Sequence, residues 1–229
     1  MKRNRHHLTA PPALAGLIVL SSLSLFPSED RLQAPKSALR KSPPFKVEVS
    51  LCVTSPFVPD GRASLAELSF KVIFPSVTFE FDPDEDPLLG RCQVNASNGK
   101  GTISRLVLND VQRGDERLPA SFLTPRPPAF PAGLGIESEP TAEDEAAARS
   151  GTAPAMVGLA LWTEFSQAPI KWGSKFGTAS LSDFKVVFEV PFRDLLAGKA
   201  HSLTLPYQGH HPEDSGTWRI DFRPAPKKK

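Results

Sequence analysis

Two short segments of this sequence gather the side chains that could bind a metal ion or carry out acid–base chemistry. The first is QGHHPEDSG at 208–216, and its four candidate ligands are His210, His211, Glu213 and Asp214. Imidazole and carboxylate groups both bind zinc, but neighbouring side chains of an extended chain point to opposite sides and do not readily share one ion. Proline and glycine in the segment are typical of turns. We therefore predict an exposed polar loop, with a metal-dependent hydrolase site as the alternative.

The second segment, FDPDEDPLLG, places three acidic residues at alternate positions: Asp82, Asp84 and Asp86. This spacing matches the first three ligands of a calcium-binding loop. The sixth position of such a loop requires glycine and the twelfth glutamate, whereas this sequence has Pro87 and Gln93 there. We therefore predict an acidic turn that ends a strand. The alternative is a calcium site that another loop completes.

No residue of the sequence stands out as catalytic. The chain has no G-x-S-x-G nucleophile elbow. Its glycine-rich stretches, NGKG and GLGIE, lack the strand, turn and helix that surround a phosphate-binding loop. We predict no bound cofactor and favour a non-enzymatic role, while enzymatic activity stays open.

Two of the three tryptophans are candidate contacts for a partner. Trp162 is out of phase with the apolar residues of its segment, and Trp172 lies in the basic and aromatic stretch PIKWGSKFG. Aromatic rings in such settings stack on sugars or dock proteins. Trp218 alternates in phase with Ile220 and Phe222, so we place it in the core.

The N-terminal segment, residues 1–26, has the order of a secretory signal peptide. A basic start, MKRNRHHL, precedes the uncharged apolar run ALAGLIVLSSLSLF at 13–26. An uncleaved anchor is the alternative, because the uncharged stretch is close to the shortest that spans a bilayer. Both interpretations place the folded part outside the cytoplasm, secreted, periplasmic or anchored at the membrane through this segment alone.

The cysteine count fits an exported protein. Cys52 and Cys92 are the two cysteines of the chain, and an even number in an oxidising compartment favours a disulfide. Cys92 falls on an apolar face of its segment, but Cys52 lies opposite the apolar residues around it. We predict the bond, with a β-bulge to bring the two side chains together.

The chain from residue 45 onward alternates between apolar and polar residues, which is the period of a half-buried strand. The clearest runs are FKVEVSLCV, LSFKVIF, VTFEF, VGLALWTEF, FKVVFEVPF, SLTLPY and TWRIDF. No βαβ rhythm appears. The pattern predicts an all-β protein, an antiparallel β-sandwich that is immunoglobulin-like in the broad sense, with a closed β-barrel as the alternative.

Local signals add three expectations. Asn98 and Gly99 predict a tight hairpin turn between two strands. Thr141 before AEDEAAAR predicts the capped start of a short helix. The segment DLLAG at 194–198 predicts one helical turn closed by glycine.

The sequence therefore divides into an export segment, a disordered spacer at 27–44, a β domain at 45–224 and a basic tail at 225–229. Within the domain, the stretch at about 113–154 is rich in proline, glycine and acid and predicts a long loop. The net charge of +2 shows no basic footprint for nucleic acid. We expect an exported, non-enzymatic binding or structural module of the cell envelope with a protein or glycan partner. A barrel that binds an apolar ligand is a further alternative.

Overall fold

The computed structural model describes residues 40–81, 91–123, 129–138, 140–165, 167–179, 184–209 and 211–226. These residues belong to one compact unit, Ser37–Lys229. The predicted export segment, the predicted acidic turn with Asp82, Asp84 and Asp86, the residue His210 and the last three lysines lie outside the described residues. No helix among the described residues is long and apolar enough to cross a membrane.

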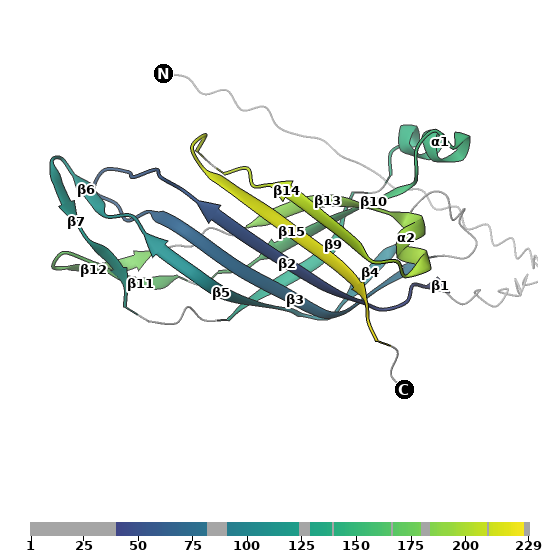
Figure 1. The fold of residues 1–229 in the computed structure, drawn as a ribbon, viewed down its shortest axis with the longest axis horizontal. Coiled ribbons are helices and arrows are strands. Elements are labelled where there is room, and N and C mark those ends of the chain that lie inside the picture. Colours follow the sequence, from purple (N-terminus) through teal and green to yellow (C-terminus); the bar gives the residue numbers. More distant parts are fainter. Residues whose placement is uncertain are drawn as a thin grey trace, which may run out of the picture. The chain divides into compact units, whose positions relative to one another are not determined.

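The elements are almost all strands, as Figure 1 shows. They are β1 (Arg40–Lys41), β2 (Phe45–Thr54), β3 (Leu65–Phe81), β4 (Gln93–Ala96), β5 (Gly99–Leu108), β6 (Val111–Arg113), β7 (Glu116–Leu118), β8 (Ala120–Phe122), β9 (Phe130–Ser138), β10 (Met156–Thr163), β11 (Ala168–Trp172), β12 (Lys175–Ala179), β13 (Lys185–Pro191), β14 (His201–Pro206) and β15 (Ser215–Pro224). Two short helices, α1 (Ala142–Ser150) and α2 (Phe192–Ala197), complete the fold. The prediction of an all-β antiparallel protein is confirmed.

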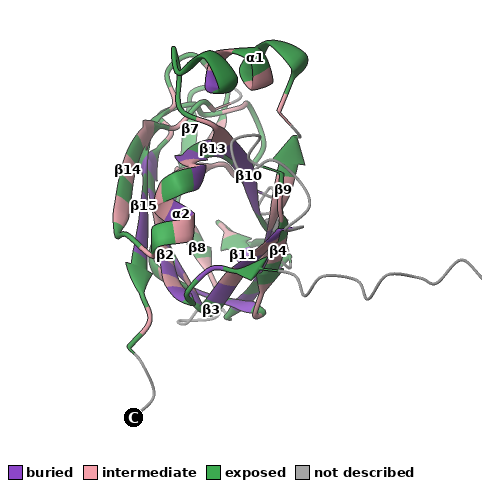
Figure 2. Ribbon diagram, turned by 90° about the vertical axis from the view of Figure 1, so that its right-hand side faces the viewer, coloured by how far each residue is buried: buried purple, intermediate pink, exposed green. Residues whose placement is uncertain are grey.

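Ten strands form one antiparallel sheet in the order β13-β10-β9-β5-β3-β2-β15-β14, with β1 and β4 also paired to β3. The sheet curls until its two ends face each other around a common interior (Figure 2). Between the described parts of the end strands β13 and β14 there is no pairing. The layers of the expected sandwich are thus opposite walls of one sheet, and the arrangement lies close to the closed-barrel alternative.

The interior of this curled sheet is filled by the apolar side of the alternating strands. Along β2, for example, Phe45, Val47 and Val49 are fully buried, while the residues between them are partly exposed. Phe70 of β3 is the centre of an aromatic cluster, whose other members are Phe130, Phe165, Phe184 and Trp218. Since ring edges fill the space between the walls, this region is a packed core.

Strand β3 is one continuous strand across Pro75, although this proline separates the two alternating runs LSFKVIF and VTFEF in the sequence. Proline has no backbone N–H to donate to a neighbouring strand. The register with β2 shifts next to Pro75, between the pairs Val47↔Phe74 and Phe45↔Val77. On its other side β3 changes partner at the same place, from β5 to β4. The proline therefore lies where the ladder is already interrupted.

The hairpin predicted at Asn98 and Gly99 is wrong. Strands β4 and β5 do not pair with each other but follow one another along β3, at Val77–Glu80 and Leu65–Ile73 respectively. Glycine at position 99 serves close packing, because a Cβ there would come within 2.5 Å of the Phe74 ring. Asn98 and Gly99 therefore lie at a break between two strands that run in the same direction along β3, and the chain does not turn back there.

The stretch at 113–154, expected to be a long loop, contains β7, β8, β9 and α1. Its proline and glycine residues concealed the alternation of β9, in which Phe130, Ala132 and Leu134 are buried. The predicted helix is confirmed, since the Thr141 side chain accepts from the backbone N–H of Asp144 and forms a capping box with it. The helical turn predicted at DLLAG is also confirmed as α2, which contributes Phe192 to the core.

The last residues of the expected spacer belong to the fold. Arg40 and Lys41 form β1 and pair with the end of β3. Ser42 is buried, and its hydroxyl accepts a hydrogen bond of 3.0 Å from the backbone N–H of Phe79. The ordered unit therefore begins before Phe45, the first residue of the predicted domain.

Two small sheets extend the main one beyond the end of β5, with orders β12-β11-β8 and β6-β7 (Figure 1). Ile170 and Ala168 of β11 are buried, so the three-stranded sheet packs through an apolar face. Its opposite face carries Phe176, which is 66% exposed. This three-stranded sheet supplies one wall of the site described below.

Candidate functional site

The loop at 208–216 does not assemble a metal site in the described residues. The His211 ring stacks on Phe57 with centroids 3.8 Å apart. Asp214 accepts hydrogen bonds from the Ser55 hydroxyl and from the backbone N–H of His211, and Glu213 is exposed. Across the described part of the chain, no three His, Cys, Asp or Glu side chains gather in a metal-binding arrangement. The loop's polar groups fasten it to the neighbouring loop that begins at Ser55.

The predicted disulfide is wrong, because Cys52 and Cys92 are both free. Cys52 lies opposite Ser69 of β3, whereas Cys92 directly precedes β4, which pairs with β3 at Glu80. The two sites are separated by roughly 35–40 Å of strand, and a disulfide requires Cα atoms within about 7 Å. Burial raises the pKa of the Cys92 thiol to about 12. Cys52 is exposed on the outer face.

Trp162 lies on the outside of the sheet, as its phase indicates, and 40% of its surface is exposed. Its indole covers Gly133 of the neighbouring strand β9, where a Cβ would come within 2.2 Å of the ring. Glycine at this position is what allows the ring to lie flat on the strand, a cross-strand arrangement that stabilises sheets. One side of the indole is therefore occupied by the protein itself.

Trp172 lies in β11 and turns towards β12, where a Cβ on Gly177 would come within 2.7 Å of its ring. On the other face of the same hairpin, the Lys171 ammonium lies 5.6 Å from the centre of the Phe176 ring. This distance is typical of a cation–π contact. Trp218, in contrast, is 2% exposed and confirms the prediction of a core position.

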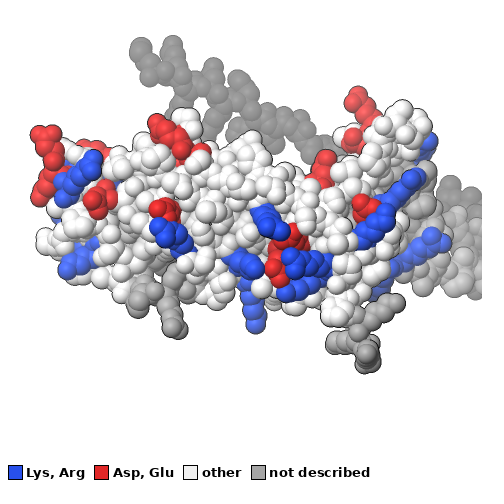
Figure 3. Space-filling model, in the orientation of Figure 1, with Lys and Arg blue, Asp and Glu red and all other residues white. Residues whose placement is uncertain are grey.

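Ion pairs cover the outer face of β2, β3 and β15. Glu48 pairs with Lys46 at 2.6 Å and with Lys71 at 3.2 Å, and the hydrogen bonds from these lysines lower its pKa. Asp221, opposite Glu48 across the strands, pairs with Arg219 at 3.2 Å. Figure 3 shows this mixture of blue and red side chains on the face. The charges neutralise one another, so the face offers no field of a single sign.

A groove lies between the edge of β5 and the three-stranded sheet. It encloses about 530 Å³, a volume within the usual range for ligand sites. Its walls are lined by Ile103, Ser104, Arg105, Leu106, Val107 and Leu108 of β5, by Ala120, Ser121 and Phe122 of β8, and by Ala168 of β11. Most of these side chains are apolar. This groove is the strongest candidate for a binding site in the described residues.

The groove runs along a strand edge. Successive side chains of a strand point to opposite faces, so the six consecutive residues 103–108 can all line one groove only if it follows the edge of β5. Strand β9 begins at Phe130, opposite Gly101 of β5, and runs antiparallel to β5 towards Gly99, so it pairs with β5 at Gly99–Gly101. From Ala132 to Ser138, β9 pairs with β10. Within the described residues, no strand pairs with the groove side of β5 from 102 to 108.

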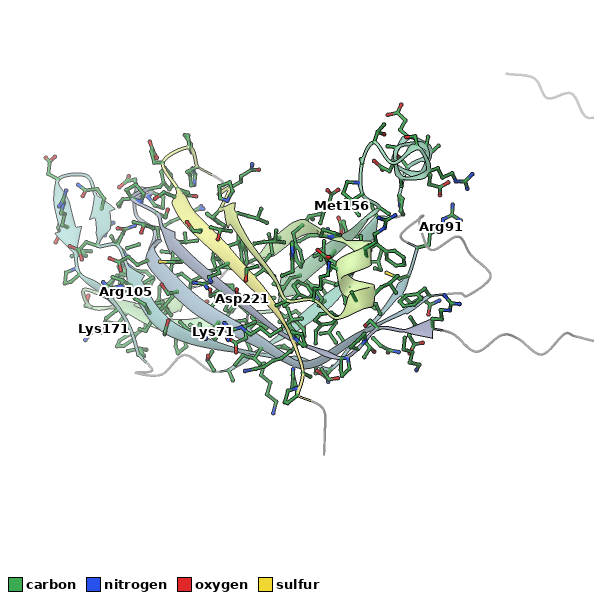
Figure 4. The ribbon with its side chains drawn as sticks, turned by 45° about the vertical axis from the view of Figure 1, so that its right-hand side comes forward. Lys71, Arg91, Arg105, Met156, Lys171 and Asp221 are labelled. Atoms are coloured by element: carbon green, nitrogen blue, oxygen red, sulfur yellow. The ribbon has the colours of Figure 1, made fainter. Side chains whose placement is uncertain are left out.

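Arg105 is the one charged residue among those that line the groove. The strands β5, β8, β11 and β12 carry Lys100, Arg105, Lys171 and Lys175 and no acidic residue. Arg105 is paired with Glu67 of β3. Figure 4 shows Arg105 and Lys171 extending from the same end of the unit. The one charged residue of the lining is therefore already paired within the protein.

Sequence reasoning placed Trp172 near this region but missed the groove itself. The groove is formed by residues of β5, β8 and β11, and which strands lie beside one another is a matter of long-range pairing. Comparison with known protein families, curated proteins and solved structures finds no match to this chain.

Proposed function

We propose that this chain is an exported, non-enzymatic binding module whose ligand occupies the groove between β5 and β8. The observation that carries the proposal is the groove of about 530 Å³ with its mostly apolar lining residues. Seven of the ten lining residues are apolar, and apolar clefts of this size are where proteins usually bind their ligands.

The basic and then apolar N-terminal segment supports export. A free Cys52 on the surface does not oppose it, because a single exposed thiol without a partner within reach cannot form an internal disulfide. The partner is therefore expected among the proteins or glycans of the cell envelope.

Photo-crosslinking in cells tests both parts of the proposal. A photoreactive amino acid replaces Ser121 on the groove wall in the full-length chain, and the matched control carries it at Thr204, an exposed position on β14. We expect an adduct from position 121 and none from position 204, in the fraction outside the cytoplasm. Adding Val107→Arg, which places a bulky charge in the groove, should remove the adduct. Equal labelling at both positions would contradict the groove, and a wholly cytoplasmic protein would contradict export.

A further inference from the structure

We propose that the outer face of the three-stranded sheet β12-β11-β8 docks on an anionic lipid surface. This face is separate from the groove, because Phe176, Lys171 and Leu123, which define it, are not among the residues that line the groove. It adds a membrane contact of the folded unit to the one expected of the N-terminal segment. The inference is carried by the apolar side chains that the face exposes and by its charge.

Alternation along the strands defines the outer face. In β11, the buried Ile170 lies between the exposed Pro169 and Lys171. Phe176 of β12 lies directly opposite Lys171 in the ladder, and directly opposed side chains point to the same side of a sheet. Leu123 follows β8, donates its backbone N–H to the carbonyl of Pro169 and is also exposed. These exposed side chains therefore belong to one face.

Apolar groups are unusually exposed on this face. Phe176 is 66% exposed, the largest fraction among the large apolar side chains of the described residues, and Leu123 is 47% exposed. Contiguous exposed apolar surface often marks a contact with a protein or a membrane. Both side chains gain free energy when they leave water for the acyl boundary of a lipid layer.

The charge of the face is positive. Lys171 and Lys175 are exposed, and within the described part of the chain neither forms an ion pair. The strands β8, β11 and β12 contain no acidic residue. The neighbouring hairpin at 111–118 contains two basic and two acidic residues, whose charges cancel. Anionic lipid headgroups therefore attract this face.

The residue types favour a lipid surface over a protein partner. Contact surfaces between proteins are enriched in arginine and depleted of lysine, because the planar guanidinium binds carboxylates in a fixed geometry. Lysine carries a compact charge on a flexible stem, which suits mobile headgroups. Lysine combined with phenylalanine and leucine is typical of elements that lie in a membrane interface. Each lysine near an anionic membrane strengthens binding about fivefold.

Photo-crosslinking to lipid tests the contact at the level of single positions. The full-length protein is used, and its N-terminal segment is expected to bind vesicles by itself, so the readout must be local. Photoreactive p-benzoylphenylalanine replaces Phe176, and the matched control carries it at Val187, which is 49% exposed on β13 of the main sheet. With vesicles of phosphatidylcholine and phosphatidylglycerol, we expect a lipid adduct at position 176 and none at 187. No adduct at 176, or equal labelling at both positions, would overturn the proposal.

The charge argument has its own arms. On vesicles of phosphatidylcholine alone, the adduct at position 176 should fall at least about fivefold, and added salt should lower it on the anionic vesicles. Lys171→Ala combined with Lys175→Ala should lower it by at least about fivefold. Lys46→Ala combined with Lys71→Ala makes the same change in net charge on the outer face of β2 and β3 and should leave it unchanged. Equal effects of the two pairs would contradict the role of the lysines.

A protein partner is the competing occupant of this face, and crosslinking in cells distinguishes it. The photoreactive group at position 176 should give lipid adducts in cells as it does with vesicles. A protein adduct in cells together with no lipid adduct on vesicles would assign the face to a protein partner and overturn docking on lipid.

Discussion

Replacement of Phe70 by alanine should destabilise the protein more than almost any other single truncation. The ring is 2% exposed and meets four other aromatic groups at centroid distances of 5.2–5.8 Å. Loss of the buried ring from the apolar interior costs about 2–3 kcal/mol. The four edge-on ring contacts add at least about 0.5 kcal/mol each. We therefore expect Phe70→Ala to lower the free energy of unfolding by about 4–5 kcal/mol, at the top of the range for such truncations.

The matched control is Phe176→Ala, the same chemical change at a ring that is 66% exposed on β12. We expect this variant to lose about 0.5 kcal/mol or less, as is usual for surface positions. Urea unfolding followed by tryptophan fluorescence measures both, with the slope m compared to confirm that both variants unfold in the same way. Similar losses for the two variants, or a loss below about 2 kcal/mol at Phe70, would refute the packed interior of the curled sheet.

Three further predictions concern other parts of the unit. Phe188→Ala should cost about 3–5 kcal/mol of unfolding free energy in a urea titration, and Glu189→Ala on the same strand about 0.5 kcal/mol or less, because only the first is buried. At pH 8, iodoacetamide should modify Cys52 in the native protein and Cys92 only after unfolding, since burial raises the pKa of Cys92 to about 12; a linked peptide pair in non-reduced mass mapping would contradict two free thiols. Thr141→Ala removes the helix cap and should speed amide exchange in α1, at a cost of about 1 kcal/mol in the local stability of the helix, so unchanged exchange would argue against the cap.

Local patterns in the sequence were sufficient to predict the strands and their buried faces. The alternation of Phe184, Val186 and Phe188 corresponds to strand β13 and the residue before it, with these three residues buried, and Trp218 lies in the core as its phase indicates. The cap at Thr141 was equally readable. Each of these features depends on residues a few positions apart, so the sequence contains the information directly.

Pairing between distant strands was beyond local patterns. Asn98 and Gly99 are compatible with a tight turn, yet here the chain continues along β3. The distance between Cys52 and Cys92 was likewise not predictable from local patterns. Cys52 lies opposite Ser69 of β3, whereas Cys92 precedes the strand that pairs with β3 at Glu80. The glycine and proline residues of β9 interrupt its apolar pattern, so the sequence did not indicate a strand there. In the structure Gly133 and Gly135 of β9 lie against the ring of Trp162, which is distant in the sequence.

The sequence by itself determined that the chain forms amphipathic strands, and its N-terminal pattern predicts export. The tertiary structure alone decided that one sheet curls around a single core and that β5, β8 and β11 lie beside one another. The groove follows from that arrangement. Strand register and partner choice depend on contacts between residues far apart in the chain, and period-2 alternation fixes which side of a strand is buried but not which strand lies beside it.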